Sequence, residues 1–180
     1  LLIDMEEQPE EKNLSIKDLA EKHKNDRFLL RIDFKNFFPS IHGENIREFL
    51  TNNTDLKLKI TDKDITLINL LICKGNALTI GSPSSPIISN TILYDFDNDL
   101  DTYCQTNSIK YSRYADDLYF TTILNDKLKH VLEFIKNYKF KFNIKLEINE
   151  KKNIFSSKKS KRIITGLSLT TENKVSIGRK

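Results

Sequence analysis

Apolar side chains recur at helical spacing along several stretches of the chain. A spacing of three to four residues places such side chains on one face of a helix, where they can pack against a core. The spacing predicts helices over residues 14–24, 44–51, 61–73, 88–103 and 126–138. Ser15 is a candidate cap for the first helix, because its hydroxyl can accept a hydrogen bond from a free backbone N–H. The fourth helix is the longest, since its apolar residues recur at every fourth position from Ile88 to Leu100.

Shorter apolar runs have the length of β-strands. Such runs cover residues 27–34, 110–114 and 118–122. Residues 140–148 alternate apolar and polar side chains, which is typical of a strand or another extended segment. Residues 162–169 and 174–178 flank the sequence Thr-Glu-Asn, which predicts a hairpin. This order of strands, helices and hairpins predicts an α+β fold with an antiparallel sheet.

Composition indicates one globular domain. Of the 180 residues, 38% are hydrophobic and 30% are charged, so the chain can bury a core of its own. No apolar run approaches the roughly 20 residues that cross a bilayer, and we expect no membrane partner. The first residues resemble neither a signal peptide nor a natural start with Met, so we expect a fragment or a processed chain.

Charge is distributed unevenly along the chain. The formal net charge is +4, which permits a polyanionic partner without requiring one. Residues 1–13 form an acidic, polar arm in which we recognise no element. Residues 151–162 and 174–180, in contrast, are strongly basic, so any nucleic-acid contact is expected toward the C-terminal part.

The two cysteines, Cys73 and Cys104, lie far apart in the sequence. A structural zinc site needs about four ligands in closely spaced pairs, and this chain has no such pattern. We therefore expect two reduced thiols in a cytoplasmic protein.

Three aspartates stand where a sheet protein rarely places charge. Asp33 lies in an apolar strand, and Asp116 and Asp117 lie between two aromatic-rich strands. A carboxylate in such a place costs several kcal/mol unless a cation or hydrogen bonds compensate it. If the strands are neighbours, Asp33 faces Asp116, and the two charges repel unless a divalent ion such as Mg²⁺ lies between them. The alternative is that Asp116 and Asp117 form a polar turn and that Asp33 ends a strand.

Five short motifs follow one another in a specific order. They are Arg-Ile-Asp-Phe-Lys-Asn-Phe-Phe-Pro-Ser-Ile at 31–41, Gly-Ser-Pro-Ser-Ser-Pro at 81–86 followed by Ser89-Asn90, Tyr-Ala-Asp-Asp at 114–117, Asn-Glu-Lys-Lys at 149–152 and Ile-Thr-Gly-Leu at 164–167. In this order they resemble motifs A, B, C and D and the following motif of the reverse transcriptase family. A bare Tyr-Ala-Asp-Asp is a weak signal, whereas the ordered set is specific. The resemblance covers roughly residues 20–180.

The resemblance implies a right-hand polymerase palm, in which helices pack on one face of an antiparallel sheet. Residues 27–180 would form the palm, with part of the fingers inserted at about 43–80. Residues 1–26 would be an N-terminal arm and helix at the end of the fingers region. We recognise no thumb in the sequence.

The same resemblance assigns the catalytic residues. Asp33 and Asp116 would bind two Mg²⁺ ions, with Mn²⁺ as a substitute, and such ions assist phosphoryl transfer. Asp117 would complete the catalytic carboxylate cluster and take a less direct part in metal binding. The backbone at Phe34 would contribute to the metal site and cradle the incoming triphosphate.

Further residues would contact the nucleotide. Gly81 and Ser82 would let their loop approach the nucleotide and the template closely, which only small residues permit. Lys152, or its neighbour Lys151, would neutralise or protonate the leaving pyrophosphate, unless both are ordinary surface charges. Phe38 would lie under the sugar and exclude a ribose 2′-hydroxyl, the alternative being that its ring packs in the core.

Basic and aromatic side chains are candidates for nucleic-acid binding. Each Lys that neutralises a phosphate steepens the salt dependence of binding. The basic candidates are Lys151, Lys152, Lys158, Lys159, Lys161 and Arg162, and a solvated face is the alternative. Tyr111 and Tyr114 are candidates for stacking on primer bases, with packing in the core as the alternative for both.

Two features are similar to retron reverse transcriptases and one departs from the family. The sequence Ala-Glu-Lys-His at 20–23 partly matches the retron pattern Asn-Ala-x-x-His, with Leu19 in place of the Asn. Ile-Thr-Gly at 164–166 is close to the retron Val-Thr-Gly. The departure is Ile80, which replaces the Gln that usually precedes the Gly of motif B and that helps to hold template and nucleotide.

The resemblance implies a nucleotidyltransferase, namely an RNA-directed DNA polymerase. It would extend a DNA primer on an RNA template with deoxynucleoside triphosphates, using a dedicated structured non-coding RNA in anti-phage defence, together with an effector protein. Ile80 keeps open a template-independent or protein-primed DNA synthesis of the abortive-infection type. A catalytically idle nucleic-acid-binding palm is a third alternative, which the retention of all three aspartates disfavours.

Overall fold

The centre of the molecule is a five-stranded antiparallel sheet with the order β1-β5-β6-β2-β7. The computed structural model describes residues 2–3, 15–52 and 60–177. The strands of the sheet are β1 (Leu2–Ile3), β2 (Phe28–Asp33), β5 (Lys110–Tyr114), β6 (Asp117–Thr122) and β7 (Ile154–Ser157). The predicted α+β fold with an antiparallel sheet is confirmed, although β7 lies outside the predicted strands.

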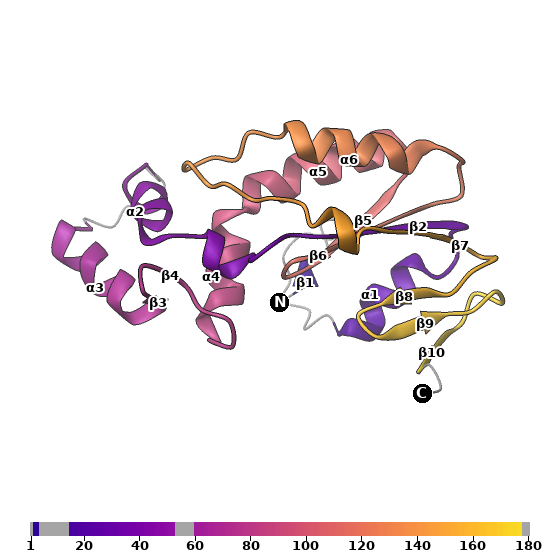
Figure 1. Cartoon of the computed structure of the whole chain (residues 1–180), viewed down its shortest axis with the longest axis horizontal. Coiled ribbons are helices and arrows are strands. Elements are labelled where there is room, and N and C mark those ends of the chain that lie inside the picture. The colour runs from indigo at the N-terminus through magenta and orange to yellow at the C-terminus, as the bar shows by residue number, and fades with distance from the viewer. Residues whose placement is uncertain (1, 4–14, 53–59, 178–180) are drawn as a thin grey trace.

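One face of this sheet is covered by helices α5 (Tyr94–Thr106) and α6 (Lys127–Asn137), as Figure 1 shows. The larger hydrophobic core lies between these helices and the sheet. It includes Leu30, Ile32, Phe96, Leu100, Leu118, Phe120, Val131 and Ile135. Successive side chains of a strand point to opposite faces, so the residues between these core positions point away from α5 and α6.

The opposite face carries helix α1 (Ile16–His23) and a small three-stranded sheet (Figure 1). The small sheet consists of β8 (Arg162–Ile164), β9 (Leu167–Leu169) and β10 (Val175–Ile177). A second core of Leu19, Ala20, Leu29, Tyr119, Ile164 and Leu169 joins these elements to the main sheet. Helices therefore cover both faces of the sheet, and the expectation of helices on one face holds for α5 and α6 only.

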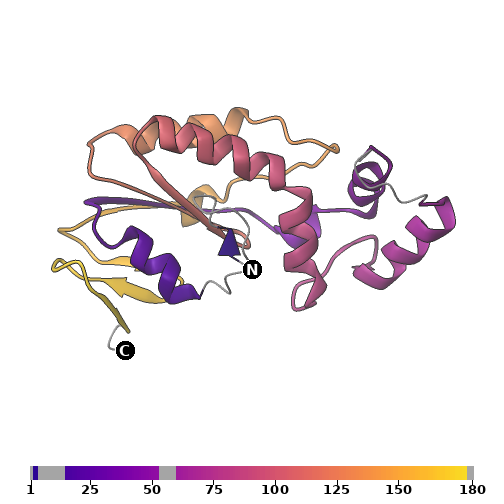
Figure 2. The ribbon, with the colours of Figure 1, turned by 180° about the vertical axis from the view of Figure 1, so that it is seen from behind.

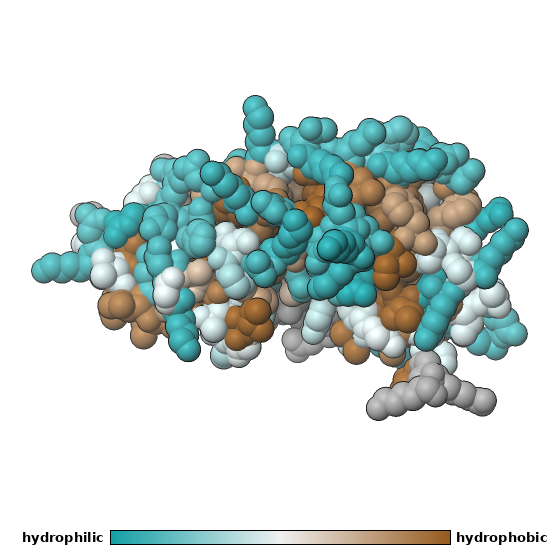
Figure 3. Space-filling model, viewed as in Figure 1, coloured by the Kyte–Doolittle hydropathy of each residue, from teal (hydrophilic) through white to brown (hydrophobic). Residues whose placement is uncertain are grey.

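Two helices and a short hairpin project beyond one end of the central sheet (Figure 1 and Figure 2). They are α2 (Gly43–Asn52), α3 (Asp62–Ile72) and the strands β3 (Cys73–Lys74) and β4 (Ala77–Leu78). The predicted helices 44–51 and 61–73 are confirmed. Leu67, Leu70 and Leu71 of α3 expose much of their side chains, which gives the brown surface at the lower left of Figure 3. The face of the molecule along α6 is mostly hydrophilic in the same view.

Local capping explains where the first and third helices begin. The Ser15 hydroxyl accepts a hydrogen bond from the Asp18 N–H, and the Asp18 carboxylate accepts one from the Ser15 N–H. Thr61 and Asp64 form the same reciprocal arrangement at the start of α3. Each capping box satisfies backbone donors that have no partner inside the helix. The predicted cap at Ser15 is thereby confirmed.

The predicted single helix over 88–103 is wrong, because the chain forms two helices there. Helix α4 (Ser84–Ile92) ends at Leu93, whose φ of −97° and ψ of 9° lie outside the helical range, and α5 begins at Tyr94. Apolar residues continue at every fourth position across this break and stay buried on both sides of it. The periodic pattern therefore could not reveal the change of direction.

The alternating segment 140–148 is not a strand of any sheet. Phe142 and Asn143 have positive φ angles of 56° and 53°, which interrupt an extended conformation. One isolated bridge joins Ile148 to Phe34. The alternation instead reflects packing, because Ile144 is buried and its apolar neighbours in the segment pack against the main core.

The predicted hairpin over 162–178 contains an additional turn. Residues 162–169 are not one strand, because β8 and β9 reverse at Thr165 and Gly166, whose φ angles are 46° and 86°. Gly tolerates such a conformation without steric cost, and it stands where the turn requires it. Residue 178 and the end of the second basic stretch lie outside the described residues, as does most of the acidic arm 1–13.

Two further expectations concerned membrane-spanning helices and the cysteines. Within the described residues, no helix is both long enough and apolar enough to cross a membrane. Cys73 and Cys104 are free thiols. Cys104 is buried in the main core, and burial raises the pKa of its thiol.

Candidate active site

The three aspartates meet at one end of the central sheet. Strand β2 ends at Asp33, and β6 begins at Asp117 as its direct antiparallel partner. The Phe34 N–H donates a hydrogen bond of 3.1 Å to the Asp116 carbonyl, which holds the turn between β5 and β6 against β2. Asp33 is therefore opposite Asp117, not opposite Asp116 as predicted. The expected convergence of the three residues holds, because all lie at adjoining strand ends.

Asp33 is the most buried of the three carboxylates, with 2% of the residue exposed. Its Oδ2 accepts a hydrogen bond of 3.0 Å from Nζ of Lys152. Its Oδ1 is buried and has no hydrogen-bond partner. A buried carboxylate oxygen without a partner is costly, so this atom is suited to receive a cation.

Asp116 is affected mainly by burial and by its acidic neighbours. Burial raises the pKa of its carboxyl above the ordinary value, and the charges of Asp117 and Asp33 raise that pKa further. Lys152 acts in the opposite direction. An additional cation beside Asp116 would relieve this repulsion.

Asp117 is engaged by protein side chains. Arg31 donates from Nε and Nη2 to Oδ1, at 2.9 and 2.8 Å, and from Nη2 to Oδ2 at 2.9 Å. The Tyr119 hydroxyl donates to Oδ2 at 3.1 Å. An ionised carboxylate offers about four lone-pair sites, so these bonds use the acceptor capacity of Asp117.

The three aspartates differ in how well they fit the expected Mg²⁺ ions. Among the described side chains, no group of three or more His, Cys, Asp or Glu residues is disposed to hold a metal ion. Asp33 and Asp116 nevertheless fit Mg²⁺, because one has a buried oxygen without a partner and the other is crowded by negative charge. Asp117 fits less well, because Arg31 already compensates its charge.

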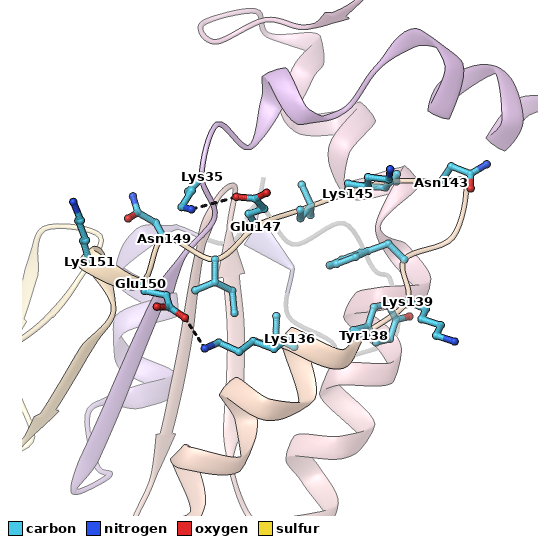
Figure 4. Close-up of a pocket in the computed structure, with 15 residues that line it drawn as sticks. Lys35, Lys136, Tyr138, Lys139, Asn143, Lys145, Glu147, Asn149, Glu150 and Lys151 are labelled. Carbon is cyan, nitrogen blue, oxygen red and sulfur yellow. Dashed lines mark hydrogen bonds and ion pairs between the residues drawn. The ribbon is translucent and has the colours of Figure 1, made fainter.

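A hollow of about 900 Å³ lies beside this site (Figure 4). It is lined by the end of α6 and by the chain from Tyr138 to Lys151. Two ion pairs join residues of its lining. Lys35 pairs with Glu147 at 3.2 Å, and Lys136 pairs with Glu150 at 2.6 Å (Figure 4). Asn149, which lines the hollow, is hydrogen-bonded to the end of β2, since its N–H donates to the Asp33 carbonyl at 2.8 Å.

The family model described as "Reverse transcriptase (RNA-dependent DNA polymerase)" matches residues 3–169. The chain belongs to the reverse transcriptase family. It is 37% identical over 175 residues to the retron Ec83 reverse transcriptase of Escherichia coli, covering 92% of this chain and 55% of the relative. It is 33% identical over 174 residues to the retron Ec86 reverse transcriptase of the same organism, covering 94% and 51%. The chain thus spans about half the length of these relatives.

Solved structures show the same fold. Telomerase from Candida albicans, in complex with a TWJ fragment of telomeric RNA, matches with a TM-score of 0.61 and 13% identity over 89% of this chain and 34% of that chain. Apo telomerase from Candida tropicalis matches with a TM-score of 0.55 and 18% identity over 82% and 32%. At these identities the likeness concerns the fold alone, and it agrees with the reverse transcriptase motifs.

The nucleotide-side residues of these motifs lie in two segments that contact each other. Phe38 is half-buried and packs edge-on against Phe37, with ring centroids 5.1 Å apart. The Leu78 N–H donates to the Ile41 carbonyl at 3.0 Å, which brings the chain leading into motif B against the end of motif A. These two segments lie about 40 residues apart in the sequence.

One expectation for this region needs correction. The Phe34 N–H is used by the Asp116 carbonyl, so it is not free to cradle a triphosphate, and Phe34 can contribute only through its carbonyl. Gly81 has a φ of 85°, a backbone conformation that favours glycine, and a Cβ there would meet no protein atom within 4 Å. The close approach of this loop to nucleotide and template stays a prediction. Ser82 hydrogen-bonds Ser84 through their hydroxyls at 2.9 Å, which stiffens the same loop.

The predicted nucleic-acid-binding residues are divided between two places. Lys151 and Lys152 lie near the aspartates. Tyr114 is 40% exposed at the end of β5, directly before the turn that carries Asp116 (the catalytic turn). Lys159 and Lys161 are exposed in the turn after β7, at the opposite end of β2 from Asp33. Lys158 lies in the same turn, half-buried, and its Nζ donates to Asn173 Oδ1 at 2.6 Å.

The predicted contacts of Arg162 and Tyr111 with nucleic acid are wrong, because both side chains are buried. Arg162 is 1% exposed, and its guanidinium donates to the Asp26 carbonyl and, at 2.9 Å, to the Thr170 carbonyl. It therefore joins β8 to the start of β2 and cannot reach a nucleic acid. Tyr111 is buried in the main core, so its ring does not stack on primer bases.

Sequence reasoning missed the residues that support the aspartates. Arg31, Tyr119 and the buried Arg113 read as ordinary strand residues. A usable signal was a cation inside an apolar strand, two residues before an aspartate at Arg31 and three residues before Asp116 at Arg113. A buried cation such as Arg113 needs an acidic partner, which it has in Asp97, and the partly buried Arg31 has one in Asp117.

Proposed function

We propose that this chain is the catalytic palm of an RNA-directed DNA polymerase that extends a DNA primer with deoxynucleoside triphosphates. The single observation that carries this proposal is the meeting of Asp33 with the Asp116–Asp117 turn at one end of the sheet. Membership of the reverse transcriptase family supports an RNA template. Residues 27–180 would be the palm, residues 43–80 part of the fingers, and residues 1–26 the end of the fingers region.

Asp33 and Asp116 are the residues that would hold two Mg²⁺ ions, or Mn²⁺ in their place. When bound, such ions stabilise the attacking and the leaving oxygen of an in-line displacement. The part of the chain itself is to hold these carboxylates rigidly at paired strand ends and to keep Asp33 away from water. Asp117 would complete the catalytic cluster from its position against Arg31.

Lys152 would act on the leaving pyrophosphate. Its side chain is 60% exposed while its Nζ contacts Asp33, so the amine is accessible and lies next to a candidate catalytic carboxylate. From this position Lys152 would donate a proton to the leaving pyrophosphate. Phe38 would contact the sugar, and the loop at Gly81 and Ser82 would contact the nucleotide and the template.

The similarity to retron reverse transcriptases supports a dedicated structured non-coding RNA as template. A role in anti-phage defence, an effector protein as partner and a cytoplasmic location belong to the same proposal. Tyr114, Lys151, Lys158, Lys159 and Lys161 would contact the nucleic acid.

Template-independent or protein-primed synthesis is a second candidate, and Ile80 favours it. Ile80 is 74% exposed in the motif B loop, at the position where the family usually has a Gln that holds the template. An exposed apolar side chain offers no hydrogen bond to a template base. A polymerase with Ile80 would therefore depend less on templated pairing.

Primer extension by the full-length protein tests the proposal. Reactions with an RNA template, a DNA template and no template separate RNA-directed synthesis from the second candidate. We expect extension on RNA, and we expect Asp116→Asn to lower it by at least a thousandfold while the circular dichroism spectrum is unchanged. Asp126→Asn is the matched control, because Asp126 is an exposed aspartate at the start of α6, and it should retain full activity. Normal extension by the Asp116 variant would overturn the proposal.

A further inference from the structure

Asp117 differs from the other two aspartates in having its whole carboxylate bound by the protein. Arg31 approaches both oxygens in a forked geometry, and the Tyr119 hydroxyl reaches one of them. Forked guanidinium–carboxylate contacts are among the strongest and most directional hydrogen bonds in proteins. Asp33, in contrast, has one oxygen without a partner.

Arg31 ties Asp117 to the strand that carries Asp33. Arg31 lies two residues before Asp33 on β2, and its partner across the sheet is Tyr119. Side chains two residues apart on a strand share a face, as do those of cross-strand partners. Arg31, Asp33, Asp117 and Tyr119 therefore occupy one face of the sheet, where the guanidinium fixes Asp117 with respect to β2.

Tyr119 ties Asp117 to the small sheet. Its hydroxyl donates to Asp117 and accepts a hydrogen bond of 3.1 Å from the Thr165 N–H. Thr165 and Gly166 form the left-handed turn between β8 and β9. Tyr119 is 1% exposed, so water does not compete for either bond. One buried hydroxyl thus connects the catalytic turn to the β8–β9 turn.

We propose that Arg31 and Tyr119 are positioning residues, which hold Asp117 as a fixed brace of the catalytic turn and couple that turn to the β8–β9 hairpin. The metal ligands are then Asp33 and Asp116, and Asp117 acts through the geometry of the turn. The inference rests on the proposed polymerase function. It goes further in giving Asp117 a mechanical part and in giving the Thr165–Gly166 turn a defined contact with the catalytic machinery.

Tyr119→Phe in the full-length protein is the central test, because it removes one hydroxyl and keeps the ring. The lost hydroxyl leaves Asp117 with one support fewer, so we expect kcat for primer extension to fall about tenfold or more. The KM for the deoxynucleotide should stay within about twofold, since Tyr119 does not touch the substrate. Tyr138→Phe is the matched control, because it removes a phenol–carboxylate bond to Asp99, which is not among the contacts of Asp117, and its kcat should be unchanged.

Mn²⁺ binding provides a readout that does not depend on activity. Titration of the full-length protein without substrate, followed by electron paramagnetic resonance of free Mn²⁺, should show binding lost in Asp33→Asn. Binding should be kept in Tyr119→Phe and in Arg31→Lys, which retains the charge without the fork. An unchanged kcat in Tyr119→Phe would overturn the coupling. Loss of Mn²⁺ binding in Tyr119→Phe, with an unchanged thermal midpoint of unfolding, would contradict the proposal that Asp117 positions the turn while Asp33 and Asp116 bind the metal. If the wild type binds Mn²⁺ but extends no primer on any template, the polymerase proposal fails instead.

Discussion

At the scale of single residues, Asp33 and Asp117 are paired with two cations of different exposure, Lys152 and Arg31. The ion pair of Asp33 with Lys152 joins a buried carboxylate to a lysine whose side chain is mostly exposed. A multivalent cation would readily replace the amine. Asp117 is held by a planar guanidinium on the sheet itself, which has no comparable freedom. The two contacts therefore fit different tasks, the first exchangeable and the second permanent.

Phe38→Ala tests the sugar contact. The ring is half-buried against Phe37, so part of it is available to a ligand. Removing it would make room for a ribose 2′-hydroxyl, and we expect the preference for deoxynucleotides over ribonucleotides, measured as the ratio of kcat/KM values, to fall at least tenfold. Phe155→Ala is the control, because Phe155 is a partly exposed Phe on the edge strand β7, away from the aspartates. An unchanged ratio in Phe38→Ala would leave Phe38 with a packing role only.

At the scale of elements, a buried ion pair fastens the catalytic turn to helix α5. Arg113 on β5 donates from Nε to Asp97 on α5 at 2.8 Å, and the Tyr111 hydroxyl donates to the same carboxylate at 2.7 Å. Arg113 also donates from Nη1 to the Ala115 carbonyl in the turn, at 3.1 Å. Breaking such a buried pair costs about 3–5 kcal/mol, because it leaves an uncompensated charge. The position of α5 is therefore linked to that of the aspartates.

Helix α1 is fastened to the opposite face by His23, which is fully buried. The Thr121 hydroxyl donates to the Asp26 carboxylate at 2.7 Å, so its oxygen is free to accept from Nδ1–H of His23, also at 2.7 Å. The other ring nitrogen, Nε2, then accepts from the Ser112 hydroxyl at 3.0 Å. His23 is therefore a neutral, internal connection between α1 and the sheet.

This burial predicts an acid-sensitive α1. Burial, together with the nearby charges of Lys22 and Lys110, lowers the pKa of His23 from 6.5 to about 3. Asp26, which faces His23 through Thr121, is paired with Lys110 at 3.2 Å. Below pH 6.5 the unfolded segment binds a proton that the folded one does not, so stability is lost as the pH falls from about 6.5 toward 3.

Hydrogen exchange of the α1 amides measures this effect. The free energy of opening α1 should fall by about 2 kcal/mol between neutral pH and about pH 5. His23→Gln should open more readily at neutral pH and show a smaller pH dependence, while His130→Gln, at an exposed position of α6, should behave as the wild type. An equal pH dependence in His23→Gln would contradict the assignment to His23.

At the scale of the whole molecule, positive charge is available at both ends of the central sheet. Lys151 and Lys152 lie near the aspartates, whereas Lys159 and Lys161 lie beyond the start of β2. The six residues of β2 separate the two groups by about 17 Å, at roughly 3.3 Å per residue. A nucleic acid bound along the sheet could contact both groups at once.

A double substitution tests this long contact. Lys159→Gln with Lys161→Gln should weaken binding of a primer–template to the full-length protein. It should also reduce the slope of log K against log salt by roughly 0.9 for each lost phosphate contact. Lys17→Gln with Lys63→Gln removes the same charge from exposed positions on α1 and α3 and should leave the slope unchanged. Fluorescence anisotropy at several salt concentrations measures both, and equal slopes would show that the far turn is only a solvated surface.

The sequence by itself determined many of the elements and the identity of the three candidate aspartates. Helix periods, capping residues and turn residues act between near neighbours, so α1, α2, α3, α6 and the β5–β6 hairpin could be read directly. The order of the motifs identified Asp33, Asp116 and Asp117 in the same way. The break at Leu93 and the turn at Thr165–Gly166 were not readable, because apolar spacing continues through both.

Only the tertiary structure decided which side chains support the site. Arg31 is 86 residues from Asp117, His23 is 98 from Thr121, and Lys152 is 119 from Asp33. Contacts at such separations depend on strand register, and a shift of one residue turns every side chain of a strand to the other face. Register is set by the packing of the whole sheet against its helices, so no local pattern encodes it. The sequence therefore identified the candidate carboxylates, whereas only the fold shows which cations contact them.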